Sequence, residues 1–374
     1  MNPGTQAGPL LAELTTLRVG GPAQRVSRTA TEDSFVGAIR DADDAGRDLL
    51  VLGGGSNVLI SDEGFPGDVV IDTRRRIQVL ETSADDVRIR ISAGHPWDEV
   101  VAHAVSEGWS GIEALSGIPG SSGATPVQNV GAYGQEIAER LVGVSVWDRE
   151  LKQRRRLAVG ELGLGYRSSA LKQSLSDPQQ PWAPTPRFVV LDVDLTLRRS
   201  VSSAPVRYAE LARALDVAVG DPAPLGEVRD AVLQLRRRKG MVLDANDPDT
   251  HSAGSFFTNP VLSTAAADQL PPGAPRYPVV AYRFTDGGPR IHEVPGKVKT
   301  SAAWLLSQAG FDKGYGMPGP AALSTKHSLA ITNRGGASAA QILRLAQELR
   351  DGVRQRFGID LVPEPVFIGL RLAE

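Results

Sequence analysis

Alternating and helical spacings of apolar residues follow one another along most of the chain. Residues 49–52 are apolar and end at three glycines, which predicts a buried strand that feeds a loop. Apolar residues alternate with basic ones over residues 87–91, and with acidic residues and threonine over residues 191–197. Both patterns have the period of two that is typical of half-buried strands. The apolar residues 366–372 predict a last strand.

Three segments carry the spacing of amphipathic helices. Residues 97–105 follow Pro96, which we expect to be the first helical residue, and precede a glycine. Residues 228–235 form a second apolar stripe, which ends in a basic run and Gly240. The third helix is predicted to start at a capping box and to run to a terminating glycine at 358. Strands and helices together predict an α+β fold.

Two proline-rich segments predict joints between these elements. Residues 174–186 are expected to form an exposed loop without regular structure, and residues 271–278 a second joint. The chain has 374 residues, which favours two or three domains.

The composition narrows the class of protein. The 41 basic and 43 acidic residues give a net charge of -2, so we expect no nucleic-acid partner. Cysteine is absent, which excludes thiol nucleophiles, cysteine-bound metals and disulfides, and the five histidines have no metal-binding spacing. The first residues do not resemble a signal peptide, and no apolar stretch reaches the ~18 residues of a membrane span. We therefore expect a cytoplasmic protein without membrane insertion.

Two glycine-rich loops are candidates for binding a cofactor. The loop after residue 52 can present backbone N–H groups to an anion, although for this loop alone a tight turn is the simpler interpretation. The loop of residues 116–134 favours a ligand, because so long a run with few core-forming side chains is costly to order. Together the loops predict a site for a diphosphate and a flat ring. The residues that we expect to contact the cofactor are Gly53, Gly54, Gly55, Ser56, Asn57, Ser116, Gly117, Ile118, Pro119, Gly120, Ser121, Gly123, Ala124, Gln128, Asn129, Gly131, Ala132 and Tyr133.

A third glycine motif has the G-x-G-x-x-G spacing of a dinucleotide fingerprint, at residues 314–319. It follows a helix-like segment, residues 302–309, and the fingerprint has meaning only between a strand and a helix. We interpret it as a loop.

Three polar residues stand in distinctive surroundings. Ser255 lies between a glycine and two phenylalanines, Glu364 lies between two prolines that stiffen its backbone, and Arg167 follows a tyrosine. Taken alone, a capping serine, a solvated glutamate and a surface arginine are the ordinary interpretations.

Seven strings in this order resemble the UDP-N-acetylenolpyruvoylglucosamine reductase (MurB) family, and they span nearly the whole chain. The strings occupy residues 15–21, 53–57, 117–134, 165–167, 254–260, 324–327 and 363–365.

The resemblance implies an FAD-binding domain of the vanillyl-alcohol-oxidase (PCMH) type in two α+β parts, followed by an α+β substrate domain. We expect the FAD-binding domain at residues 1–200, with subdomains of about 1–65 and 66–200, and the substrate domain at residues 201–374. The final strand, residues 366–374, is expected to return to the first subdomain. Residues 174–186 and 279–294 match none of the family's pattern.

The resemblance also implies the reaction. It is the reduction of UDP-N-acetylglucosamine enolpyruvate to UDP-N-acetylmuramate in peptidoglycan synthesis, in two halves, with NADPH as reductant and FAD as carrier. By motif, Arg167, Ser255 and Glu364 match the catalytic arginine, proton-donating serine and catalytic glutamate of the family. The expected substrate-binding residues are Tyr166, Tyr208, Lys239 and Asn259. Tyr208 resembles the tyrosine that the first type of the family folds over bound substrate, and a half-buried aromatic at a helix start is the alternative interpretation.

We expect FAD to be bound without a covalent link and the protein to be a monomer. Covalent attachment in this fold class uses His, Cys or Tyr, and in the second loop only Tyr133 is of such a type. Three alternatives stay open: a flavin oxidase of the same fold, a non-catalytic flavin- or nucleotide-binding module, and a nicotinamide dehydrogenase based on residues 314–319. The binding module would not bring Arg167, Ser255 and Glu364 together.

Overall fold

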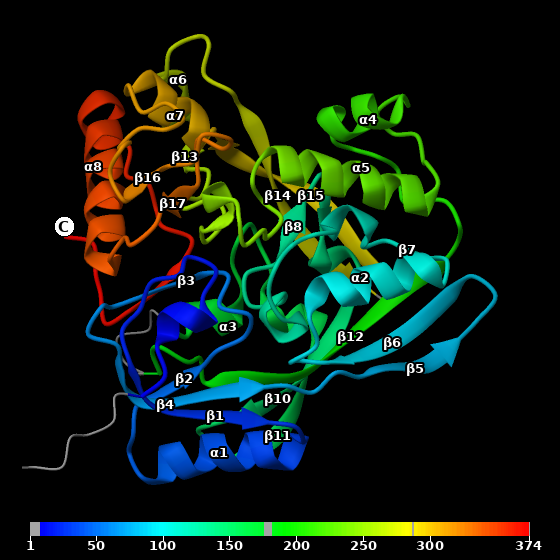
Figure 1. The fold of residues 1–374 in the computed structure, drawn as a ribbon. Helices are drawn as coiled ribbons and strands as arrows, with labels where there is room; N and C mark the ends of the chain where they lie inside the picture. Colours follow the sequence, from blue (N-terminus) through cyan, green and yellow to red (C-terminus); the bar gives the residue numbers. More distant parts are fainter. Residues whose placement is uncertain (1–7, 176–181, 286–287, 374) are drawn as a thin grey trace, which may run out of the picture.

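The computed structural model describes residues 8–175, 182–285 and 288–373 (Figure 1). Its first sheet is parallel, in the order β1 (Ala23–Thr29), β4 (Phe65–Asp72), β2 (Leu49–Val51). Helix α1 (Glu32–Asp44) lies along this sheet and turns its apolar side to it. Strand β4 pairs with both β1 and β2 and so lies between them.

A larger antiparallel sheet continues the chain, in the order β11-β10-β12-β6-β5, with β7 beside the end of β12. Its strands are β5 (Ile77–Thr82), β6 (Asp86–Ser92), β7 (Trp109–Ser110), β10 (Leu141–Asp148), β11 (Gln153–Ala158) and β12 (Phe188–Arg199). The strands predicted at residues 87–91 and 191–197 are therefore confirmed as β6 and β12. These two strands pair with each other, and their apolar residues share one core with helix α2 (Trp97–Ser106). Pro96 is the residue before α2 and not its first helical residue, which corrects the prediction.

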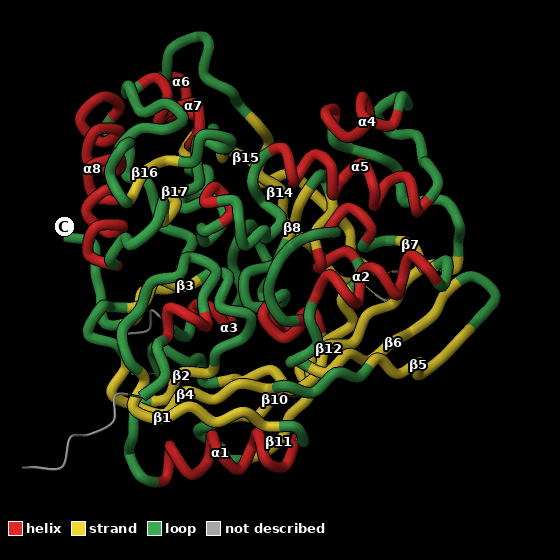
Figure 2. Tube along the Cα trace, viewed as in Figure 1, coloured by secondary structure: helices red, strands yellow, loops and turns green. Residues whose placement is uncertain are grey.

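Between residue 200 and residue 357, the described part of the chain contains five α-helices and five strands, which Figure 2 shows in different colours. The helices are α4 (Ala209–Leu215), α5 (Leu225–Arg238), α6 (Thr264–Asp268), α7 (Ala302–Gln308) and α8 (Ala339–Phe357). The strands are β13 (Val261–Ser263), β14 (Tyr277–Thr285), β15 (Gly288–Lys299), β16 (Ala321–Leu323) and β17 (Ile331–Asn333). Helix α8 starts at the predicted capping box of Ser338 and Gln341 and ends at Gly358, whose φ is 68°.

Two predicted loops prove to contain more structure than expected. Residues 279–285 and 288–294 lie in the antiparallel hairpin of β14 and β15, and the joint predicted at residues 271–278 ends inside β14. In the loop predicted at residues 174–186, residues 176–181 lie outside the described residues. Thr185, which belongs to the same loop, is buried and not exposed. Its hydroxyl donates a hydrogen bond to the carbonyl of Leu49 and accepts one from the N–H of Val51.

The end of the chain returns to its beginning. Strand β18 (Val366–Ile368) pairs in parallel with β3 (Val58–Ile60), although it is shorter than the predicted 366–372. The N–H of Val366 donates to the carbonyl of Asn57, so the 363–365 string lies beside the first glycine loop. The division of the chain into domains stays a prediction.

Short elements hold the remaining loops. They are helix α3 (Ala170–Gln173), the strand pair β8 (Gly131–Ala132) and β9 (Gln135–Glu136), and 3₁₀ turns at Leu11–Leu14, Glu113–Leu115, Ser122–Ala124, Ile137–Glu139, Val159–Leu162 and Pro248–Thr250. Residues 314–319 form a loop between α7 and β16, as predicted. Among the described residues no helix combines the length and the apolar character that crossing a membrane requires.

Candidate active site

The two glycine-rich loops face each other across a cavity of about 200 Å³. Their backbones are in close contact: a Cβ atom on Gly54 would lie 2.7 Å from the Cα of Gly120, and one on Gly53 only 2.4 Å from the Oγ of Ser121. Only glycine fits such an approach. The predicted residues that line the cavity are Gly53, Gly54, Gly55, Ser56, Asn57, Gly120, Ser121, Gly123, Ala124 and Gln128.

The other predicted cofactor residues lie outside the lining of this cavity. They are Ser116, Gly117, Ile118, Pro119, Asn129, Gly131, Ala132 and Tyr133. Some of them fix the shape of the loop. Ser56 Oγ donates to the carbonyl of Pro119 at 3.0 Å, and the N–H of Gly117 donates to Asp98 Oδ1 at 2.6 Å.

The walls of the cavity suit FAD. Apolar side chains of Leu50, Leu52, Val127 and Ile368 line it beside the glycine backbone. Apolar walls accept a flat ring, and a run of backbone N–H groups accepts a diphosphate. The residues present therefore fit the cofactor that the resemblance implies.

Arg167 and Glu364 form an ion pair beside this cavity. Arg167 Nε lies 3.2 Å from Glu364 Oε1, at an angle that does not meet the geometry of a hydrogen bond. Arg167 Nη2 donates to the carbonyl of Gly131 at 3.0 Å, and Nη1 lies 3.5 Å from the carbonyl of Asn129. The backbone of Arg167 has a φ of 51°, a left-handed value that is uncommon for a residue with a side chain. The surrounding contacts must hold this strained turn in place.

Residues that line the first cavity also hold Glu364 in place. Gln128 Nε2 donates to Glu364 Oε1 at 3.2 Å, and Asn57 Nδ2 donates to Gln128 Oε1 at 3.0 Å. Lys172, which lines the cavity, has its Nζ 3.5 Å from the same Gln128 oxygen. Burial lowers the pKa of Lys172, and the nearby Glu364 acts in the opposite direction. The carboxylate of Glu364 thus lies where residues of the cofactor cavity and the ion pair meet.

Ser255 contacts a histidine. Its Oγ lies 3.1 Å from His327 Nε2, and either atom can be the donor, depending on the tautomer of the ring. Burial, together with the positive charges of Lys239, Lys313 and Arg236, lowers the pKa of His327 to about 4. The ring is therefore neutral at pH 7.

A short strand-like contact brings the three predicted catalytic residues into one region. The N–H of Glu364 donates to the carbonyl of Phe256 at 2.9 Å, and Phe257 forms a bridge with Pro363. Ser255 therefore precedes the residue that binds the backbone of Glu364, which in turn is paired with Arg167. This arrangement argues against the non-catalytic binding module.

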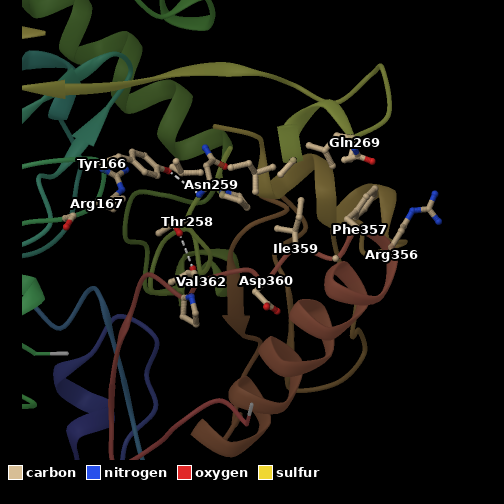
Figure 3. A pocket seen from close by; sticks show the side chains of 18 of the residues that line it. Tyr166, Arg167, Thr258, Asn259, Gln269, Arg356, Phe357, Ile359, Asp360 and Val362 are labelled. Carbon is tan, nitrogen blue, oxygen red and sulfur yellow. Dashed lines mark hydrogen bonds between the residues drawn. The ribbon is translucent and has the colours of Figure 1, made fainter. Parts of the chain in front are cut away.

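A second, larger cavity of about 1330 Å³ begins at Arg167 and Tyr166 and extends to the end of α8 (Figure 3). The hydroxyl of Tyr166 accepts a hydrogen bond from the N–H of Asn259 at 3.2 Å. The Asn259 side chain accepts one from the N–H of Ala302, at the start of α7. Lys172 lines both this cavity and the first one, so the two cavities adjoin.

The remaining predicted substrate residues gather near α4 and α5. The rings of Tyr208 and Tyr133 meet edge to face, with centroids 5.5 Å apart, and Lys239 Nζ lies 5.7 Å from the Tyr133 ring. Tyr208 precedes α4 and is 44% exposed. Lys239 is paired with Glu210 at 2.5 Å.

The sequence predicts no role for three residues of the site. His327 lies in one string of the resemblance, residues 324–327, and that string is the available signal. Lys172 stands in no motif. Lys299, whose Nζ lies 4.4 Å from the centroid of the Tyr166 ring, is at the end of β15, in a hairpin that the sequence did not predict. Within the described ranges no group of His, Cys, Asp and Glu is placed to bind a metal ion.

The fold and the first cavity define the class of protein. Residues 23–152 match the family described as FAD binding domain, and the protein is an FAD-containing oxidoreductase. Residues 247–368 match the family described as UDP-N-acetylenolpyruvoylglucosamine reductase, C-terminal domain.

Whole-chain relatives agree with both matches. UDP-N-acetylenolpyruvoylglucosamine reductase of Salinispora arenicola is 52% identical over 368 residues, with 97% of this chain and 95% of the relative covered. The enzyme of the same name from Thermobifida fusca is 52% identical over 363 residues, with 97% of each chain covered. The crystal structure of the reductase (MurB) from Thermus caldophilus superposes with a TM-score of 0.62 at 25% identity, over 96% of this chain and 97% of that one. The chain belongs to the UDP-N-acetylenolpyruvoylglucosamine reductase family.

Proposed function

We propose that this protein reduces UDP-N-acetylglucosamine enolpyruvate to UDP-N-acetylmuramate, with NADPH as the reductant and non-covalent FAD as the cofactor. The step belongs to peptidoglycan synthesis, and with it to cell-wall biogenesis, cell shape and division. Family membership supports the reaction. The observation that carries the assignment of the site is the pair of Arg167 and Glu364, 3.2 Å apart, beside the backbone segment of Ser255 and between two adjoining cavities.

Bound FAD supplies hydride transfer to the carbon–carbon double bond of the substrate. That addition moves negative charge into the carboxylate conjugated with the double bond. Arg167 is suited to stabilise this charge, because its guanidinium is planar and permanently ionised. The hydrogen bond from Nη2 to the carbonyl of Gly131 and the ion pair with Glu364 fix the direction of the group.

Ser255 is proposed to protonate the neighbouring carbon. A hydroxyl is a weak acid at neutral pH and needs a hydrogen-bond partner to assist it. The neutral His327, 3.1 Å away, is such a partner. Glu364 is proposed as a second polar contact to the substrate carboxylate, through a shared proton or hydrogen bond.

The nucleotide part of the substrate is proposed to lie between Tyr208 and Lys239 on one side and Tyr166 and Asn259 on the other. Lys239 carries the charge that a diphosphate requires, and Glu210 holds it in place. Tyr208, in edge-to-face contact with Tyr133, supplies an exposed ring that can cover the ligand. We further propose that the protein works in the cytoplasm as a monomer and has neither a nucleic-acid partner nor a membrane-inserted segment.

Anaerobic flavin absorbance tests the proposal. The purified protein is first bleached with NADPH, and UDP-N-acetylglucosamine enolpyruvate is then added. Rapid return of the yellow band on that addition alone supports both half-reactions. A colourless protein that FAD does not reconstitute would contradict the cofactor, and a flavin that bleaches but ignores the sugar nucleotide would contradict the substrate. Rapid oxygen consumption with an alcohol, in the absence of the sugar nucleotide, would favour the oxidase alternative.

A further inference from the structure

The hairpin of β14 and β15 reaches the strand pair β8–β9, which lies next to Arg167. Tyr282, on β14, donates a hydrogen bond from its hydroxyl to Glu136 Oε2 at 2.7 Å. Its ring stacks on Phe284, with centroids 6.0 Å apart, and both rings pack against the core of the large sheet. Residues 279–294 lie outside the seven strings of the resemblance, so no role for Tyr282 is predicted from the sequence.

Glu136 also binds Asn129. The same oxygen, Glu136 Oε2, accepts a hydrogen bond from Asn129 Nδ2 at 2.7 Å. Asn129 is fully buried and has a φ of 47°, so its side chain and backbone are both constrained. Its Oδ1 accepts from the N–H of Ala138 at 3.1 Å, which fixes which way the amide points.

Asn129 contacts both the backbone turn that carries Arg167 and the guanidinium group of Arg167. Its Nδ2 also donates to the carbonyl of Gly165 at 3.1 Å, and Gly165 and Ser168 close the turn that carries Arg167 by mutual backbone hydrogen bonds. Its own carbonyl oxygen lies 3.5 Å from Arg167 Nη1. Glu136 acts on the second anchor as well, because its strand β9 pairs with Gly131, whose carbonyl accepts from Arg167 Nη2.

We propose that Tyr282 and Glu136 are positioning residues for Arg167. Hydrogen bonds between Tyr282 and Glu136, between Glu136 and Asn129 and between Asn129 and Arg167 let the hairpin restrain the orientation of the Arg167 side chain. The proposal rests on the function assigned above, in which Arg167 faces the substrate carboxylate. A second contact from the hairpin supports it: Lys299, at the end of β15, lies over the ring of Tyr166, the neighbour of Arg167. Burial and the adjacent Glu136 carboxylate raise the pKa of Tyr282, so its hydroxyl stays protonated and remains a donor.

The test is Tyr282→Phe, which removes the hydroxyl and keeps the packed ring. In anaerobic stopped-flow measurements we expect the limiting rate of flavin reoxidation by UDP-N-acetylglucosamine enolpyruvate to fall about 10- to 100-fold, the size typical of a small misplacement of a catalytic group. Flavin reduction by NADPH should keep its wild-type rate, because the role proposed for Arg167 belongs to the other half-reaction. The matched control is Tyr315→Phe, since the Tyr315 hydroxyl also binds a glutamate, Glu348, but on the exposed side of α8. It should leave both half-reactions unchanged.

A double-mutant cycle separates positioning from a general structural effect. If Tyr282 acts through Arg167, Tyr282→Phe should have no further effect in an Arg167→Ala background. A wild-type rate for Tyr282→Phe, or an undiminished effect in that background, would overturn the inference and leave the proposed function standing. Failure of the wild-type flavin to be reoxidised by the sugar nucleotide would instead overturn the proposed function, and with it the role of Arg167.

Discussion

Ser255 Oγ and His327 Nε2 lie 3.1 Å apart, although 72 residues separate them in the chain. The histidine is in the loop between β16 and β17, which the N–H and hydroxyl of Thr325 tie to the carboxylate of Asp249. Arg334 donates to the same carboxylate at 2.7 Å. A weak acid is thus placed next to a neutral base on a loop that is itself anchored.

Ser255→Ala is predicted to separate the two half-reactions. Loss of the proton donor should slow substrate reduction by roughly 10²- to 10⁴-fold, in line with lost general-acid catalysis, while flavin reduction by NADPH survives. Stopped-flow absorbance measures both rates. Ser307→Ala is the control, because its hydroxyl binds Asp312 on the exposed side of α7. Equal slowing of both half-reactions would make Ser255 a structural residue.

His327 is predicted to make stability depend on pH. Its ordinary pKa of about 6.5 applies to the unfolded chain, whereas the folded value is lowered to about 4. Between these values the unfolded chain binds the proton and the folded protein does not, so stability falls as the pH decreases from 6.5 to 4. His327→Gln removes this titration, and Tm should then vary less steeply with pH in that window. His292→Gln, at an exposed position of β15, should keep the wild-type slope; the same slope in both variants would contradict the prediction.

Gly54→Ala is predicted to lower the FAD content of the purified protein. The added Cβ would lie 2.7 Å from the backbone of Gly120, so the two cofactor loops must move apart. The ratio of flavin to protein absorbance measures the effect. Gly37→Ala is the matched control, because in the middle of α1 a Cβ meets nothing within 4 Å. That substitution should raise stability by about 0.5–1 kcal/mol and leave the FAD content unchanged. Full flavin content in Gly54→Ala would show that the loops tolerate separation.

Asp98→Asn is predicted to loosen the second cofactor loop. Asp98 accepts from the N–H of Gly117 at 2.6 Å and from two nitrogens of Arg229 at 2.7 and 2.9 Å. Burial opposes ionisation of Asp98, but the hydrogen bonds from Arg229 and Gly117 prevail and lower its pKa. Loss of the charge should cost about 1–2 kcal/mol in urea unfolding and weaken FAD binding. Glu99→Gln, the next residue along α2, should change stability by less than about 0.5 kcal/mol, because its pair with Arg75 is exposed.

Local patterns in the sequence predicted much of the fold. The alternation that predicted β6 and β12 and the capping box that predicted α8 depend on residues close together in the chain, so they are readable without a tertiary structure. The hairpin of β14 and β15 escaped prediction because neither strand has a buried residue, so the sequence lacks a clean alternation of buried apolar and exposed polar positions. The buried Thr185 escaped because a polar residue among prolines gives no sign of the strand that it will bind.

For the site, the residue types at the glycine loops and at Arg167, Ser255 and Glu364 can be read from the sequence, and the order of the strings indicates the family. The contacts that these residues make are visible in the folded protein alone. The contacts of Arg167 with Glu364 and of Ser255 with His327 join segments far apart in the chain. Such contacts form because the packing of the whole fold, including the return of β18 to β3, stabilises the protein by more than the closing of long loops costs in entropy. No local pattern encodes that outcome, which is why Tyr282, Lys172 and Lys299 became visible only in three dimensions.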